Sequence, residues 1–89
     1  MRAHFTVEAD VPDKVLLISD NNDGAMSITN DAEAVVAYLT KQQLIKPGKR
    51  LVYRDTDGRW DELVHNGCGK FMGFAPVADL DWLLNGTRQ

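Results

Sequence analysis

One helical segment, residues 30–44, most constrains the fold of this chain. Four apolar side chains recur there at the i, i+3, i+4 and i+7 positions of a helix: Ala32, Val35, Val36 and Leu39. That spacing places them on one face, whereas the charged residues Glu33 and Lys41 lie off it. A helix this short depends on tertiary packing for its stability in water. The segment therefore predicts a sheet against which its apolar face lies.

The ends of this helix are predicted from local chemistry. Asn30 and Glu33 have the spacing of a capping box, in which each side chain accepts a hydrogen bond from the backbone N–H of the other residue. Pro47 disfavours helical geometry at the residue before it, and Gly48 follows. The helix is therefore expected to end near Leu44.

Three strands are expected before the helix. Residues 4–8 alternate between apolar and polar side chains, which is the pattern of a half-buried strand. Residues 14–19 contain an unbroken aliphatic run at 15–18, which indicates a central strand covered on both faces. A polar turn at residues 20–24 then leads to a short strand at residues 25–28.

Residues 50–65 predict a hairpin after the helix. Asp55 at the first position of its turn and Gly58 at the fourth favour a type I turn followed by a left-handed glycine bulge. In this register Arg54 pairs with Trp60, whereas a tighter two-residue turn would shift the pairing and exchange the faces. One face is expected to carry Leu51, Tyr53 and Leu63, and the other Val52, Arg54, Trp60 and Val64.

The chain is expected to close with one more strand and a short helix. Residues 71–75 complete a meander with the hairpin, and Gly73 within them indicates a bulge or a close backbone approach. Residues 79–84 have the pattern of a short helix with three leucines on one side. Trp82 is expected in the core in preference to a dimer contact, because a small domain needs its aromatic side chains there.

These elements predict one α+β domain spanning residues 1–89. The expected order is three strands, a long helix, three strands and a short C-terminal helix. About five or six short strands form a mainly antiparallel sheet, with the long helix packed on one face. The connection through that helix leaves a parallel pairing of its flanking strands open. The second face of the sheet is expected to be covered by the segment around Trp82 or by a second subunit.

Charge and cysteine content narrow the classes of function. The formal net charge of −3 argues against nucleic-acid binding, which needs a basic surface. The single cysteine, Cys68, cannot form an internal disulfide. No apolar run has the length of a signal-peptide core or a membrane span. We therefore expect a cytoplasmic protein without a membrane partner.

The motifs of common cofactor, metal and catalytic sites are incomplete in this chain. The glycine-rich run 67–70 lacks the first glycine of a Walker loop, and Phe71 replaces its serine or threonine. The turns at residues 20–24 and 55–58 lack the terminal ligands of a calcium loop. His65 and Cys68 have a metal-like gap but too few companions for a zinc site or a catalytic triad. The sequence therefore predicts no cofactor, no metal and no enzymatic activity.

A candidate protein interface is predicted on the hairpin and on the C-terminal helix. Tryptophan, tyrosine and arginine are enriched at binding hot spots, and exposed apolar side chains offer a contact for a second copy. The candidate residues are Tyr53, Arg54, Arg59, Trp60, Leu80, Trp82 and Leu83. In the alternative interpretation, Trp60 caps the edge of the core and Arg54 lies over its ring.

The leading hypothesis is a non-enzymatic module. It would bind another protein through residues 50–65, or associate with itself through residues 79–84. A second hypothesis is a phage- or plasmid-type inhibitor of a host protein, which the small size and mild acidity allow. A third is an enzyme or small-ligand binder that uses the Cys68 loop together with His65.

Overall fold

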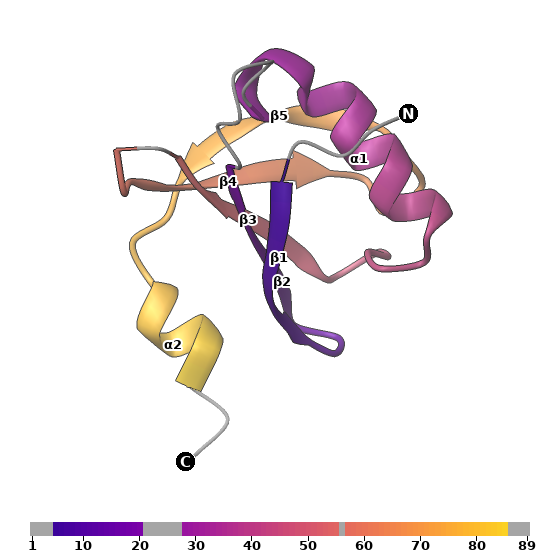
Figure 1. The fold of residues 1–89 in the computed structure, drawn as a ribbon. Coiled ribbons are helices and arrows are strands. Elements are labelled where there is room, and N and C mark those ends of the chain that lie inside the picture. The colour runs from indigo at the N-terminus through magenta and orange to yellow at the C-terminus, as the bar shows by residue number, and fades with distance from the viewer. Residues whose placement is uncertain (1–4, 21–27, 56, 86–89) are drawn as a thin grey trace.

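The computed structural model describes residues 5–20, 28–55 and 57–85, which form one five-stranded sheet with helices on it (Figure 1). Neighbouring strands follow the order of the chain, from β1 at one edge to β5 at the other. The described elements are β1 Phe5–Val11, β2 Val15–Asp20, the 3₁₀ turn η1 Ile28–Asp31, α1 Ala32–Lys41, β3 Arg50–Arg54, β4 Trp60–His65, β5 Phe71–Pro76 and α2 Leu80–Asn85.

One of the four strand pairs is parallel. β1–β2, β3–β4 and β4–β5 are antiparallel, whereas β2 and β3 run parallel and are joined through η1 and α1. The residues of β2 from Val15 to Ser19 are buried, which fits a strand that is covered on both faces. The predicted fold class, a mainly antiparallel α+β sheet with one longer helix and a short C-terminal helix, is confirmed.

The sheet separates two hydrophobic clusters. The larger cluster lies between the sheet and α1, and it contains the buried residues of α1 together with Leu16, Ile18, Ile28, Ile45, Leu51, Tyr53 and Leu63. The smaller cluster lies on the opposite face, which we call the second face, and it contains Val15, Leu17, Val52 and Leu83. Leu83 comes from α2, so this short helix covers part of the second face.

The strand expected at residues 25–28 is wrong at its one described residue. Ile28 begins η1, is fully buried in the α1-side cluster, and donates its N–H to Oδ2 of Asp20 at 3.3 Å. Burial of Ile28 beside α1 is the reason that the chain already winds here instead of extending. Residues 25–27, and residues 21–24 of the expected turn, lie outside the described part of the chain.

The start of α1 differs from the prediction, although its apolar stripe is confirmed. The N-cap is Asp31, and no side-chain hydrogen bond caps the helix at that residue. The predicted capping box between Asn30 and Glu33 is therefore wrong, because Asn30 belongs to η1 and does not stand at the N-cap. The buried residues of α1 are the four predicted ones: Ala32, Val35, Val36 and Leu39.

α1 ends at Lys41, before the predicted end at Leu44. Gln43 has a φ of 62°, in the left-handed region. Its N–H donates to the carbonyl of Thr40 at 2.9 Å, and the N–H of Leu44 donates to the carbonyl of Leu39 at 2.9 Å. This is the Schellman motif, with glutamine in the position that glycine usually occupies. The helix is thus ended by local backbone hydrogen bonds, before the chain reaches Pro47.

Replacing Gln43 with glycine should raise the free energy of unfolding by about 1 kcal/mol, because a left-handed backbone costs a residue with a Cβ about that much. Urea unfolding followed by circular dichroism measures the change. Gln42→Gly is the matched control: Gln42 has a φ of −80°, so glycine there should lower stability through chain entropy. A loss of stability in both variants would contradict the proposed strain at Gln43.

The edge strand β5 contains a bulge. Val64 lies opposite Gly73 and His65 opposite Phe71, so Met72 has no partner residue in β4. Gly73 has a φ of 144°, which favours glycine. The bulge predicted at Gly73 is therefore confirmed. It leaves Phe74 opposite Leu63, on the α1 side of the sheet.

Candidate functional site

The turn between β3 and β4 sets the positions of the hairpin side chains. The N–H of Asp55 donates to the carbonyl of Arg59 at 2.9 Å, and the N–H of Gly58 donates to the carbonyl of Asp55 at 3.0 Å. One carboxylate oxygen of Asp55 also accepts from the N–H groups of Asp57 and Arg59, both at 2.9 Å. Gly58 has a φ of 86°. The predicted bulged register is confirmed, because Arg54 lies opposite Trp60.

Trp60 and Arg54 form a cation–π pair on the second face. The guanidinium carbon of Arg54 lies 5.4 Å from the centroid of the Trp60 ring, and the ring packs against the second-face cluster. Arg54 also forms an ion pair with Glu8 at 3.7 Å, and Glu8 accepts a hydrogen bond from the hydroxyl of Ser19 at 2.6 Å. Trp60 thus covers the edge of the core with one face of its ring, and the half-exposed Arg54 lies over the ring.

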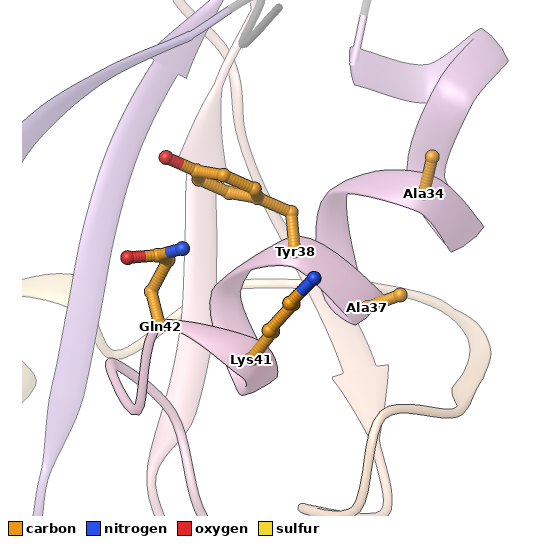
Figure 2. A pocket seen from close by; sticks show the side chains of 5 residues that line it. All are labelled: Ala34, Ala37, Tyr38, Lys41 and Gln42. Carbon is orange, nitrogen blue, oxygen red and sulfur yellow. The ribbon is translucent and has the colours of Figure 1, made fainter. Parts of the chain in front are cut away.

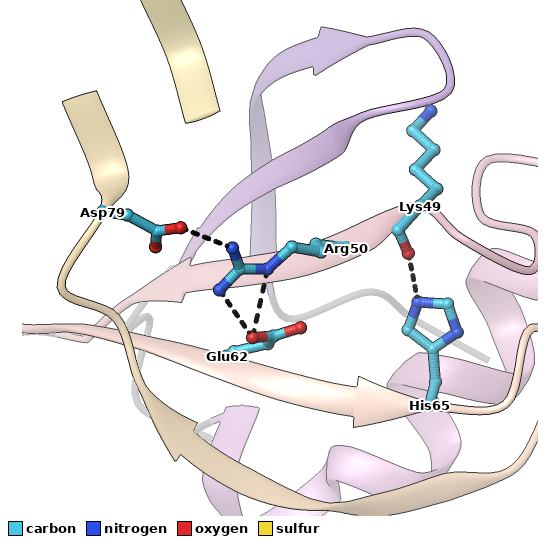
Figure 3. Close-up of polar contacts among 5 residues, drawn as sticks. All are labelled: Lys49, Arg50, Glu62, His65 and Asp79. Atoms are coloured by element: carbon cyan, nitrogen blue, oxygen red, sulfur yellow. Dashed lines mark hydrogen bonds and ion pairs between the residues drawn. The ribbon is translucent and has the colours of Figure 1, made fainter. Parts of the chain in front are cut away.

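An ion triad holds the start of α2 to the sheet (Figure 3). Arg50 donates from Nη2 to Glu62 at 2.8 Å and from Nη1 to Asp79 at 2.9 Å. The hydrogen bonds to Glu62, followed by the one to Asp79, raise the pKa of Arg50 above its ordinary value against the opposing effect of burial. The carbonyl of Asp79 accepts the N–H of Leu83 at 2.9 Å, in the first turn of α2. The triad therefore fixes where α2 begins on the second face.

α2 buries Leu83 and exposes Trp82. Leu83 is buried between Val15, Leu17 and Val52, whereas Trp82 is 56% exposed. The ammonium of Lys14 lies 4.0 Å from the centroid of the Trp82 ring. The expectation that Trp82 lies in the core is wrong, because adjacent residues of a helix point in different directions and Leu83 takes the inward one.

The structure divides the seven candidate interface residues between core and surface. Tyr53 is buried in the α1-side cluster, and Leu83 is buried in the second-face cluster, so neither is available for a partner. Burial, followed by the nearby Asp61 carboxylate, raises the pKa of Tyr53. Four of the others lie on the second face or on α2, and we call them the second-face surface: Arg54, Trp60, Leu80 and Trp82. Arg59 pairs with Asp55 at the end of the hairpin, so it lies on the α1 side of the sheet with Tyr53.

The loop at residues 66–70 is held by His65. A carbonyl only accepts, so His65 donates from Nε2 to the carbonyl of Lys49 at 2.6 Å (Figure 3). A backbone N–H only donates, so His65 accepts at Nδ1 from Gly67 at 2.9 Å. Cys68 is free and exposed, and its backbone N–H donates to Oδ1 of Asn66 at 2.7 Å. Both ring nitrogens of His65 are thus engaged by backbone, and a role as a base for Cys68 would require the ring to leave them.

A groove on the outer side of α1 has no motif in the sequence to mark it. It has a volume of about 370 Å³ and is lined by Ala34, Ala37, Tyr38, Lys41 and Gln42 (Figure 2). The Tyr38 and Gln42 side chains extend to one side of the helix, and the two alanines lie on the other. Helical spacing of small residues off the apolar stripe is the one signal that could have indicated it. Its open shape and divergent polar groups select no class of ligand.

Residues 5–20, 28–55 and 57–85 contain no cluster of three or more histidine, cysteine, aspartate or glutamate side chains suited to a metal ion. Within the same ranges, every helix is too short or too polar to cross a membrane. Comparison of the chain with protein families, with curated proteins and with solved structures finds no match.

Proposed function

We propose that this chain is a non-enzymatic interaction module that binds another protein through the second-face surface. The observation that carries the proposal is Trp82, which is 56% exposed on a helix whose next residue is buried. Tryptophan is among the side chains most enriched at binding hot spots. Exposure of its large apolar ring to water is unfavourable, and burial of the ring against a partner would remove this cost. Lys14 holds the ring in one place, so less side-chain entropy is lost on binding.

The charges around this surface favour a protein partner over a nucleic acid. Positive groups at half-buried Lys14 and exposed Arg54 alternate with carboxylates at Glu8 and Asp81. A nucleic-acid surface would need uncompensated positive charge, whereas a mixed rim around aromatic residues is typical of protein interfaces. The free thiol of Cys68 fits a reducing compartment such as the cytoplasm.

Trp82→Ala should weaken binding to the natural partner about 30-fold, which corresponds to a hot-spot loss of about 2 kcal/mol. The partner is first captured on the immobilised protein and identified by mass spectrometry. Its affinity for the purified variants is then measured by calorimetry. Arg54→Ala, at an exposed position of the same surface, should weaken binding by a smaller factor.

Val7→Ala is the matched control. Val7 is 44% exposed and lies opposite Ile18, whose side chain is in the α1-side cluster, so the change removes apolar surface from the other face. It should leave the affinity unchanged. Wild-type affinity in both Trp82→Ala and Arg54→Ala would exclude the second-face surface as the binding site.

A further inference from the structure

The edge strand β5 presents an apolar surface without charge. Among the described residues β5 pairs only with β4, so the outer side of the strand is open. None of its six residues is charged, and two large side chains are exposed, Met72 at 61% and Phe74 at 47%. The opposite edge, β1, carries Glu8 and Asp10. Charged side chains on an edge strand oppose pairing with another chain, so β5 is the edge that lacks this protection.

Phe74 has two aromatic neighbours, one on its own strand and one toward the core, and none among the described residues on the outer side of the strand. Its ring centroid lies 4.9 Å from that of Phe71 and 6.2 Å from that of Tyr53. Tyr53 is in the core, so Phe74 continues the core outward to the rim of the sheet. A second aromatic ring across the edge would cover the remaining side of Phe74.

The charges at the two ends of β5 favour an antiparallel copy of the same strand as the occupant. Exposed Lys70 precedes the strand. Asp79 follows it and keeps a half-exposed carboxylate, one oxygen of which already binds Arg50. An antiparallel copy brings Lys70 toward the partner's chain end that carries Asp79, whereas a parallel copy would bring like charges together. An isologous contact of this kind has a two-fold axis, as most homodimers do.

We propose that two copies of this chain associate through β5, antiparallel, with the two-fold axis passing between the two Phe74 residues. Residues opposite one another in an antiparallel pair share a face, so Phe74 of each copy lies on the α1 side against the other. The bulge at Met72 and the missing N–H of Pro76 limit the backbone pairing to Gly73–Ala75. The dimer is therefore weak and dissociates on dilution.

Light scattering and sedimentation of the full chain, from micromolar to millimolar concentration, should show a mass that rises from monomer to dimer. Phe74→Lys and Phe74→Glu should each stay monomeric, because like charges face each other at the axis. An equimolar mixture of these two variants should recover the dimer mass. Circular dichroism confirms that each variant is folded.

Met72→Lys provides a second variant that touches none of the aromatic ring pairs, and it should also weaken the dimer. Val7→Lys places the same charge at the β1 edge and should leave the dimer intact. A wild-type chain that is monomeric at millimolar concentration overturns the proposal. So does a dimer that persists in both Phe74 variants, or one that Trp82→Ala abolishes and Phe74→Lys does not. The contact is separate from the second-face surface, so the two proposals fail independently.

Discussion

Replacing Gly67 with alanine should lower the free energy of unfolding by about 3 to 5 kcal/mol. A Cβ at this position would lie 2.4 Å from the backbone nitrogen of Pro47 and 2.5 Å from its Cα. Backbone atoms cannot rotate away as a side chain can, so the loop must move and break the hydrogen bonds of His65. The φ of 79° adds backbone strain. Urea unfolding followed by circular dichroism gives the value.

Gly58→Ala is the control that separates the clash from the strain. Gly58 has a similar φ of 86°, but a Cβ there meets nothing within 4 Å. Gly58→Ala should lower the free energy of unfolding by about 1 kcal/mol, the cost of a left-handed backbone alone. Equal losses in the two variants would show that the contact with Pro47 relaxes freely.

Replacing Asp10 with alanine should lower the free energy of unfolding by about 2 to 4 kcal/mol, because it leaves a buried ammonium without its partner. The side chain of Lys49 is 6% exposed and pairs with the half-exposed carboxylate of Asp10. Lys49 is the one charged residue that is buried among residues 5–20, 28–55 and 57–85, and the carboxylate offsets its desolvation. Urea unfolding of the purified variant measures the change.

The double variant Asp10→Ala with Lys49→Met tests the reason for this loss. Methionine keeps most of the apolar length of lysine and removes the charge, so the double variant should recover most of the lost stability. Lys46→Ala breaks the exposed ion pair with Asp13 and should cause no measurable change. A double variant less stable than Asp10→Ala alone would contradict the desolvation argument.

The parts of the fold that the sequence predicts well depend on short-range chemistry. Asp55 and Gly58 lie within one turn, and their conformational preferences alone determine the register that places Trp60 opposite Arg54. The aliphatic run of β2 likewise indicates burial on both faces without knowledge of its neighbours. The apolar stripe of α1 is equally local, since helical spacing alone identifies it.

The errors occur where tertiary contacts decide between local alternatives. Burial of Ile28 moves the start of the helix, so Asn30 never reaches the N-cap. Gln43 adopts a left-handed conformation that its residue type does not favour, because Leu44 then packs on the core. No local pattern distinguishes these outcomes from those predicted.

The sequence predicts which residue types form the candidate surface, but it does not predict which of these side chains point outward. Tyr53 and Leu83 have the residue types of a binding surface, yet their strand and helix positions point them into the two clusters. Trp82 is exposed because only one side of the short helix α2 can face the sheet, and Leu83 occupies it. The side of α2 that faces the sheet depends on the position of its first turn, which the Asp79–Arg50 ion pair fixes.

The parallel pairing of β2 with β3 has a consequence for how the chain reaches this structure. Every other strand pair joins neighbours across a turn or a short loop, so it closes a small loop at low entropic cost. The parallel pair joins Val15 to Arg50 and requires η1 and α1 to span the gap. The β2–β3 pair, in the most buried part of the sheet, therefore joins the residues that lie farthest apart in the sequence. Such pairings slow folding.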